Sequence, residues 1–324
     1  MPYVEATGAR LYFEECGYGY PIIFVHEFAS DMRGWESQLR HFARDYRCVA
    51  FNARGYPPSD IPQNDASYGW ELAVYDIAAV LQGLGIERAH VVGSSMGGYA
   101  ALQFGLRYPQ KVSAIVAAGV GSGSHPSHRD AWLRETSVLA RVFSEHGMAA
   151  VAERMARGPA RIQLKYKDPK GWQEFVARLR QYSPQGMANT MARCQALRPS
   201  VHDLRDQLLG MTVPVLLAVG DEDVRCLEPT LMLKSTLPNA GLWICPNTGH
   251  AINLEEPAAF NTQVESFLSA VERGSWRRRY LSTQSRSEFV SPRYACANGS
   301  AGQVDQNLAL HLQDGRPLQS ARAE

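Results

Sequence analysis

The sequence lacks any uninterrupted apolar run of about 20 residues, the length that a membrane-spanning helix requires. Residues 1–5 are not a basic segment followed by an apolar stretch, so we expect no signal peptide. The net charge of +1 gives no reason to expect a nucleic acid or an anionic membrane as a partner. These absences favour a cytoplasmic protein, and a hydrophobic content of 45% is ordinary for a globular one.

Cysteine is scarce as well, and its spacing fits neither a dithiol redox protein nor a zinc-site protein. No C-x-x-C motif occurs, and no cysteine forms a ligand-like pattern with histidine. We therefore expect reduced thiols, no bound metal and no cofactor. The six cysteines are scattered along the chain: Cys16, Cys48, Cys194, Cys226, Cys245 and Cys296.

The most informative motif that is present covers residues 90–98, where a serine stands at the centre of a G-x-S-x-G pattern. Apolar residues before the motif predict a buried strand, and small residues after it allow close helix packing. This strand-turn-helix context is what a nucleophile elbow needs. Because Gly93 and Gly97 lack Cβ atoms, neighbouring backbone can crowd a turn that strains and exposes Ser95. Ser95 is the candidate nucleophile, and a glycine-rich turn with a capping serine is the alternative.

A serine hydroxyl becomes a good nucleophile only beside an oriented base, so the motif predicts partners further along the chain. In folds built on this elbow, an acid and then a histidine follow the serine. The apolar run 213–219 leads into the cluster Gly220-Asp221-Glu222-Asp223, and the apolar run 242–245 leads towards His250. Sites of open α/β sheets lie at the carboxyl ends of such strands. The residues alone leave open which acid is the partner, and a solvated acidic turn remains the alternative.

In these motifs the chain resembles the α/β-hydrolase superfamily, over about residues 3–271. The stretches 22–28, 52–59 and 249–257 add to the resemblance and stand in the family's order. The resemblance implies an α/β-hydrolase fold, with a mostly parallel central sheet flanked by helices and an inserted helical cap. The family's G-x-x-D pattern selects Asp223 as the triad acid, with Asp221 as the runner-up.

The resemblance also implies a mechanism. His250 would remove the Ser95 proton as the oxygen attacks a carbonyl, while Asp223 would hold the imidazole tautomer. The elbow supplies one backbone donor to the oxyanion, the N–H of Met96. For the second donor the resemblance points to Phe28, which follows the position of the family's usual His-Gly pair.

Two residues beside these motifs have open roles. Glu27 replaces the family's common glycine, and a carboxylate aimed into the oxyanion hole would oppose the developing negative charge. We therefore expect Glu27 to point away from the site; contact with a cationic substrate group or with water is the alternative. Cys226 could line the site, although a packing thiol is the simpler interpretation.

Apolar runs that alternate with helical periodicity predict the core of the fold. Such alternation argues for a mostly parallel sheet covered on both faces. Strands are expected at 4–6, 11–15, 22–25, 48–51, 89–92, 112–118, 213–219 and 242–245, and helices near 35–42, at 72–84, after the elbow and at 257–271.

The strand signal disappears between residues 121 and 210, which predicts a helical insertion. In the resembled family, the insertion at this place is a cap that shields the active site from water. Its larger side chains could face the substrate, although most should form the cap core: Trp132, Phe143, Met187 and Met191.

Composition completes the domain organisation. We expect a hydrolase core at 1–120 and 211–272, a cap at 121–210 and a disordered tail at 273–324. The tail has eight arginines against four acidic residues and few apolar clusters, which is typical of disorder.

The resemblance implies a serine hydrolase that acts on a small carboxylic ester or lactone, similar to carboxylesterases and enol-lactonases. Carbon-carbon bond hydrolases and cofactor-free haloperoxidases or perhydrolases share the triad and stay open. Many of the former carry an aromatic residue where this chain has Ala251. A hydrolase-fold receptor for a small molecule is the alternative from another class. Epoxide hydrolases and haloalkane dehalogenases are disfavoured, because they place an aspartate where Ser95 stands.

Overall fold

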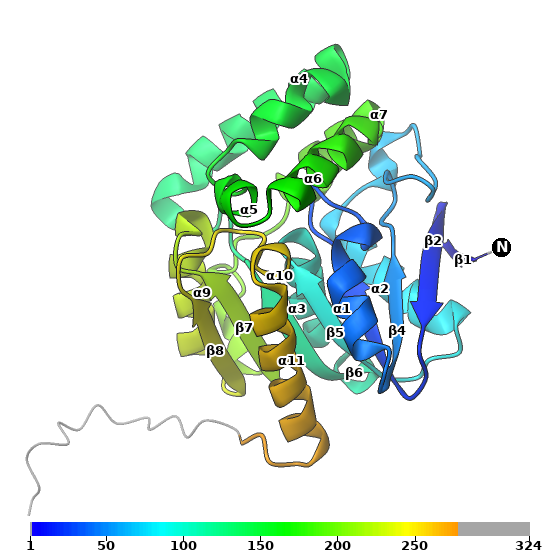
Figure 1. The fold of residues 1–324 in the computed structure, drawn as a ribbon, viewed down its shortest axis with the longest axis vertical. Helices are drawn as coiled ribbons and strands as arrows, with labels where there is room; N and C mark the ends of the chain where they lie inside the picture. Colours follow the sequence, from blue (N-terminus) through cyan, green and yellow to red (C-terminus); the bar gives the residue numbers. More distant parts are fainter. Residues whose placement is uncertain (1, 278–324) are drawn as a thin grey trace, which may run out of the picture. The chain divides into compact units, whose positions relative to one another are not determined.

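The computed structural model describes residues 2–277 of the 324-residue chain. An eight-stranded sheet lies at its centre, in the order β1-β2-β4-β3-β5-β6-β7-β8 (Figure 1). The first two strands are antiparallel, and the strands from β4 to β8 in that order run parallel. The strand bounds are β1 Tyr3–Ala6, β2 Ala9–Cys16, β3 Tyr20–Val25, β4 Tyr46–Phe51, β5 Ala89–Ser94, β6 Val112–Ala118, β7 Val215–Gly220 and β8 Ala240–Cys245.

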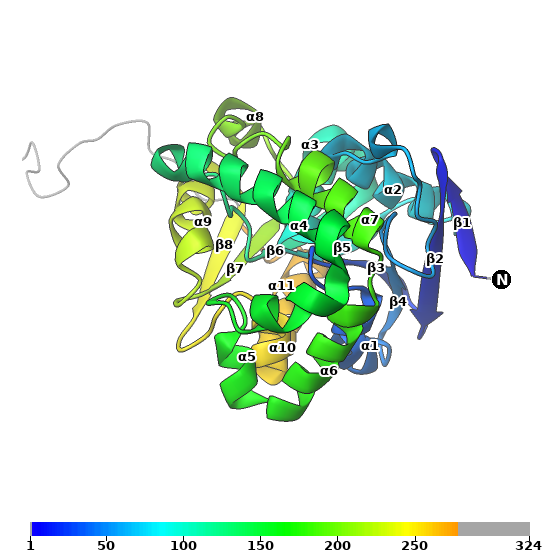
Figure 2. The same cartoon turned by 90° about the horizontal axis from the view of Figure 1, so that it is seen from above.

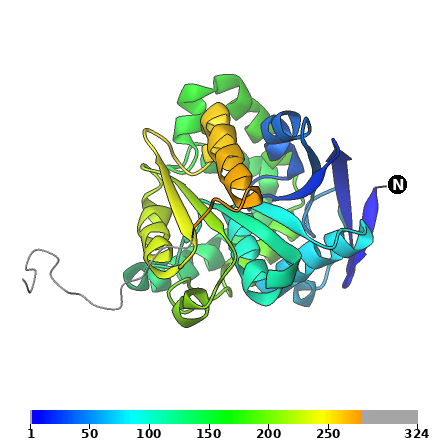
Figure 3. The ribbon, with the colours of Figure 1, turned by 90° about the horizontal axis from the view of Figure 1, so that it is seen from below.

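Side chains alternate between the two faces of the sheet, and a layer of helices covers each face. On one face, Ile23, Val91 and Ile115 pack against the helices α2 (Trp70–Gly83), α3 (Met96–Arg107) and α9 (Val224–Thr236). On the other face, Phe24 and Val116 pack against α1 (Glu36–Phe42), α10 (Ile252–Glu255) and α11 (Pro257–Glu272). The view from below shows α1 in blue and α11 in orange on the same side of the sheet (Figure 3). The predicted α/β fold with its mostly parallel sheet is therefore confirmed, and each predicted strand is present with its ends moved by a few residues.

A second group of helices lies over the carboxyl ends of the parallel strands (Figure 2). The expected helical insertion corresponds to this group, and its long first helix is kinked at Gly147, whose φ is +73°. Its members are α4 (Arg129–Ala156), α5 (Ile162–Lys167), α6 (Pro169–Gln181) and α7 (Pro184–Asn189), followed by a π-helical turn at Thr190–Gln195. Helix α8 (Arg205–Leu209) comes next and packs beside α9, with Leu208 in the core of the sheet.

Sequence periodicity did not predict α9 and α10. Helix α9 contains Pro229, a residue that ordinarily marks the end of a helix, and α10 has only four residues. Most of the expected tail, residues 278–324, lies outside the described part of the chain. Among the described residues, no helix has the length and hydrophobicity that a membrane crossing demands.

Candidate active site

Ser95 occupies the sharp turn between β5 and α3. Its backbone has φ +50° and ψ −110°, a left-handed conformation that is rare and strained for a non-glycine residue. The turn is tight, because a Cβ atom on Gly97 would lie 2.1 Å from the carbonyl oxygen of Val25. Ser95 is partly exposed while its chain neighbours on both sides are buried. The turn thus holds one hydroxyl at the surface of an otherwise closed junction.

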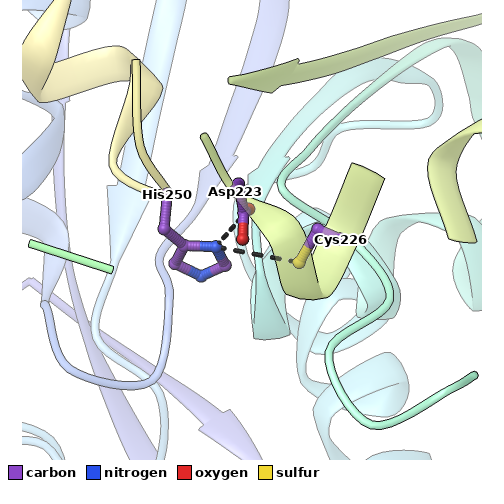
Figure 4. Close-up of side chains that lie close together, drawn as sticks. All are labelled: Asp223, Cys226 and His250. Carbon is purple, nitrogen blue, oxygen red and sulfur yellow. Dashed lines mark hydrogen bonds and ion pairs between the residues drawn. The ribbon is translucent and has the colours of Figure 1, made fainter. Parts of the chain in front are cut away.

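His250 and Asp223 come together at the ends of neighbouring strands. Asp223 follows β7 at the start of α9, and His250 lies in the loop after β8. The Nδ1 atom of His250 lies 2.6 Å from Oδ2 of Asp223, and both residues are buried (Figure 4). Asp221, the alternative acid, is exposed, and its carboxylate instead accepts the Thr248 N–H at 3.1 Å. The geometry therefore pairs His250 with Asp223.

The environment of this pair favours an imidazole that binds protons readily. Burial, the largest single influence, disfavours the charged imidazole, but the negative charge of Asp223, its hydrogen bond and the neighbouring Cys226 thiol together outweigh burial and raise the pKa of His250 well above its usual value. Burial likewise penalises the Asp223 carboxylate, yet the charge and hydrogen bond of His250 keep the pKa of Asp223 below its usual value. The two directions agree, and both describe a charge-assisted hydrogen bond.

Glu255 fixes the loop that carries His250. Its buried carboxylate accepts the N–H groups of Gly249, at 2.6 Å, and Ala251, at 3.1 Å, the residues on either side of His250. The loop backbone around the imidazole is therefore held from both sides. Glu255 falls within the stretch 249–257, but no local sequence signal indicates that it holds this loop.

Ser95 and His250 lie at the same end of β6. The Ser95 N–H donates to the carbonyl oxygen of Ala118 at 2.7 Å, and a Cβ atom on the following Gly119 would lie 3.2 Å from Nδ1 of His250. Within residues 2–277, the Ser95 hydroxyl forms no hydrogen bond with His250. Catalytic hydrogen bonds are often long in ligand-free proteins and shorten when substrate binds.

The loop after β3 is the expected source of an oxyanion donor. Nε2 of His26 accepts the Ala53 N–H at 3.0 Å, so the proton of a neutral ring resides on Nδ1 and is donated to the carbonyl oxygen of Glu27 at 2.8 Å. Burial lowers the pKa of His26, which favours that neutral form. The Phe28 carbonyl in turn accepts the Tyr56 hydroxyl. Met96 is the first residue of α3, where a backbone N–H has no acceptor within the helix.

The expectation that Glu27 points away from the site is wrong. Glu27 is only 4% exposed, and its Oε2 atom forms an ion pair with Arg161, which lies between α4 and α5. The same oxygen lies 3.8 Å from Nε2 of His250. The buried Arg161 guanidinium compensates the negative charge of Glu27, which would otherwise oppose the developing oxyanion. The guanidinium also lies over the Phe175 ring. Arg161 could not be identified from the sequence, because a lone arginine in a helical insertion belongs to no motif.

Cys226 lies on the opposite side of the imidazole. Its Sγ atom is 3.8 Å from Nδ1 of His250, 3.2 Å from the Gly119 carbonyl oxygen and 3.1 Å from the Ser122 hydroxyl oxygen. The side chain is fully buried. Cys226 therefore packs behind the histidine-aspartate pair.

The larger side chains of the insertion mostly form its core, as expected. Phe143, Met187 and Met191 are buried in one apolar cluster. The same cluster includes Phe28 and Met96, the two predicted oxyanion donors. The insertion thus packs directly on the loops that surround Ser95.

A strained serine at a strand-helix turn, with a histidine-aspartate pair at the same sheet edge, is the arrangement of hydrolases with a nucleophile elbow. The chain belongs to the alpha/beta hydrolase fold family, whose model matches residues 20–257.

Proteins similar to this chain differ in their chemistry. A 2-hydroxy-6-oxo-6-phenylhexa-2,4-dienoate hydrolase of Burkholderia cepacia is 25% identical over 265 residues, 80% of this chain and 91% of the relative. The 3-oxoadipate enol-lactonase 1 of Acinetobacter baylyi is 25% identical over 252 residues, 78% of this chain and 89% of the relative. The crystal structure of the enol-lactonase from Burkholderia xenovorans shares the fold, with a TM-score of 0.73 and 21% identity over 83% of this chain and all of that one.

Proposed function

We propose that this protein is a serine hydrolase that cleaves a small carboxylic ester or lactone through an acyl-enzyme on Ser95. The observation that carries the proposal is the strained, partly exposed Ser95 at the carboxyl ends of the parallel strands, where His250 is hydrogen-bonded to Asp223. The similarity to an enol-lactonase supports the choice of an ester or lactone carbonyl.

The proposed reaction proceeds in two stages. His250 accepts the Ser95 proton through Nε2 as Oγ bonds to the carbonyl carbon, and Asp223 stabilises the resulting imidazolium. His250 then protonates the leaving alkoxide, and the acyl group remains on Ser95. In the second stage His250 takes a proton from water as the water oxygen bonds to the acyl carbon. His250 then returns that proton to Ser95 Oγ as the bond between the acyl group and Ser95 breaks, which releases the acid and restores the enzyme.

Backbone N–H groups of Met96 and Phe28 are the proposed donors to the oxyanion. Met96 supports this role through its place at the first position of α3, where its N–H is unused by the helix. Phe28 supports it through a loop that His26 and Tyr56 both hold. The loss of one such donor costs about 3 to 4 kcal/mol of transition-state stabilisation.

We further propose that the helical insertion at 121–210 acts as a cap over this site. Its contacts with the site loops support the idea, since Phe143 packs 6.0 Å from the Phe28 ring, measured between ring centroids, and Arg161 is paired with Glu27. Such a cap would exclude water during acylation and shape the acyl pocket. The core would then be 1–120 with 211–272.

The test combines an active-site label with an esterase assay. Purified protein is treated with a fluorophosphonate and assayed with p-nitrophenyl esters of different chain length. Ser95→Ala should abolish labelling and lower kcat by several orders of magnitude, and Ser94→Ala, a change at the buried neighbour, is the matched control. A folded wild-type protein that neither labels nor turns over any ester would refute the proposal and favour a hydrolase-fold receptor.

A carbon-carbon bond hydrolase is the second candidate, supported by the similarity to the Burkholderia cepacia dienoate hydrolase. The same nucleophile and base would act, with a carbanion as the leaving group. A substrate of that type hydrolysed with a kcat/KM well above the best ester would favour this candidate. Ester or lactone turnover without it would favour the first.

A further inference from the structure

Three different metal-binding groups converge behind the proposed catalytic histidine. They are the Asp223 carboxylate, the Cys226 thiol and the His250 imidazole, and their ligand atoms all lie within 4.8 Å of one another (Figure 4). All three residues are buried. Among residues 2–277, no other group of three or more potential metal ligands lies as close together.

We propose that these three side chains bind a zinc ion that inhibits the enzyme. A thiolate, an imidazole nitrogen and a carboxylate oxygen together are a ligand set that suits Zn²⁺, whereas Mg²⁺ and Ca²⁺ prefer oxygen alone. Three protein ligands leave a fourth tetrahedral position for water. The spacing of the residues along the chain matches no zinc pattern, so the sequence predicted no metal here.

The measured geometry is close to what zinc requires. With Zn–S near 2.3 Å and Zn–N near 2.0 Å at tetrahedral angles, sulfur and nitrogen should lie about 3.5 Å apart. The Cys226 Sγ to His250 Nδ1 distance is 3.8 Å, so that pair needs little movement. The His250 to Asp223 distance of 2.6 Å must widen to about 3.4 Å, which a modest side-chain rotation supplies.

The surroundings of the thiol fit a bound thiolate. Cys226 loses its proton to solvent when zinc binds, because the ligand is the thiolate. The Ser122 hydroxyl, 3.1 Å from Sγ, can then donate to the sulfur and stabilise its charge. Asp223 and His250 are 6% and 7% exposed, so a narrow part of the pair is open to solvent.

Zinc at this position would stop the base from working, a consequence that rests on the proposed function. The metal takes the lone pair of Nδ1, so the proton of the neutral ring moves from Nδ1 to Nε2. Nε2 then carries a hydrogen and has no lone pair to accept the Ser95 proton. The Asp223 carboxylate, now a metal ligand, no longer orients the imidazole.

Metal binding can be measured without any substrate, so its failure is distinguishable from failure of the proposed hydrolysis. Chelator-treated protein is titrated with Co²⁺, whose visible and near-ultraviolet bands report tetrahedral thiolate coordination, and Zn²⁺ is then added in competition. Wild type should give a thiolate-to-cobalt band that zinc removes. Cys226→Ser should lose the band, and Cys48→Ser, a change at a buried thiol outside the cluster, should keep it.

Inhibition is the second readout, with the best ester from the panel. Zinc should inhibit wild type and Cys48→Ser, a chelator should reverse the effect, and Cys226→Ser should need about tenfold more zinc or higher for half inhibition. Inhibition of each variant is expressed relative to its own activity without zinc, and Cys226→Ala serves if the serine variant folds poorly. Wild type that gives no thiolate band, or a Cys226 variant with unchanged zinc binding, would overturn the proposal.

Discussion

The buried ion pair between Glu27 and Arg161 should behave as one unit, so that breaking it is worse than removing it. The two side chains are 4% and 7% exposed, and Arg161 also donates to the Ala160 carbonyl at 3.1 Å. Arg161→Met keeps most of the side-chain volume and the contact with Phe175 but leaves the Glu27 carboxylate unpaired. Loss of one partner of a buried pair typically lowers the free energy of unfolding by about 3 to 5 kcal/mol.

The double variant Glu27→Gln with Arg161→Met should recover most of that loss, because no charge then remains buried. Replacement of both members of a buried pair is often close to neutral, so the coupling free energy should be about 3 kcal/mol. The assay is urea unfolding of wild type, both single variants and the double variant. Arg157→Met, which breaks an exposed pair with Glu153, is the matched control and should have little effect.

Activity should follow the same pattern for a separate reason. The unpaired Glu27 carboxylate would lie 3.8 Å from Nε2 of His250 and would raise the pKa of the ring further, so that less of the neutral imidazole is present to accept the Ser95 proton. We expect kcat/KM, measured with chelator present, to fall in Arg161→Met and to rise again in the double variant. A single variant destabilised by less than about 1 kcal/mol, or a double variant no better than the single one, would refute the reasoning.

Three further results are expected. Burial raises the pKa of Asp31, but the hydrogen bond and charge of Arg33 lower it below its usual value, so this stabilisation is present above about pH 4 and lost in acid; Asp31→Asn should flatten the acid side of a plot of unfolding free energy against pH. Gly186→Ala places a Cβ atom 2.1 Å from the Gly55 carbonyl oxygen and should cost about 1 to 3 kcal/mol in thermal unfolding. Phe143→Ala, at a fully buried ring, should cost about 3 to 5 kcal/mol by urea unfolding, and a loss below about 1 kcal/mol would contradict its place in the core.

The core of the fold could be predicted because its signals are local. A strand such as β6 is a short apolar run between polar turns, and α2 stops at a glycine-containing turn, so neighbouring residues alone define both. Helix α9 was missed for the opposite reason. Its internal Pro229 contradicts the local rule, and the helix is held by packing of Met232 and Leu233 on the sheet.

The candidate site likewise contains residues that local sequence signals identify and residues that they do not. Ser95 and His250 each follow a recognisable strand, so their sheet edge could be predicted from sequence. Among the three acids of the cluster, burial and hydrogen bonding separate Asp223 from Asp221, and neither property is visible in four consecutive letters.

Glu27 shows why a charged residue cannot be interpreted from its own position. From the sequence, a carboxylate in place of glycine beside an oxyanion hole has to turn outward, because inward it would oppose the reaction. That conclusion assumes that no cation lies within reach. Arg161 is 134 positions away in sequence, and only the packing of the helical insertion on the loop after β3 brings the two together. Glu27, which replaces the family's common glycine, and Arg161 of the insertion therefore form one feature. A relative with glycine at the position of Glu27 has no electrostatic need for an arginine at the position of Arg161.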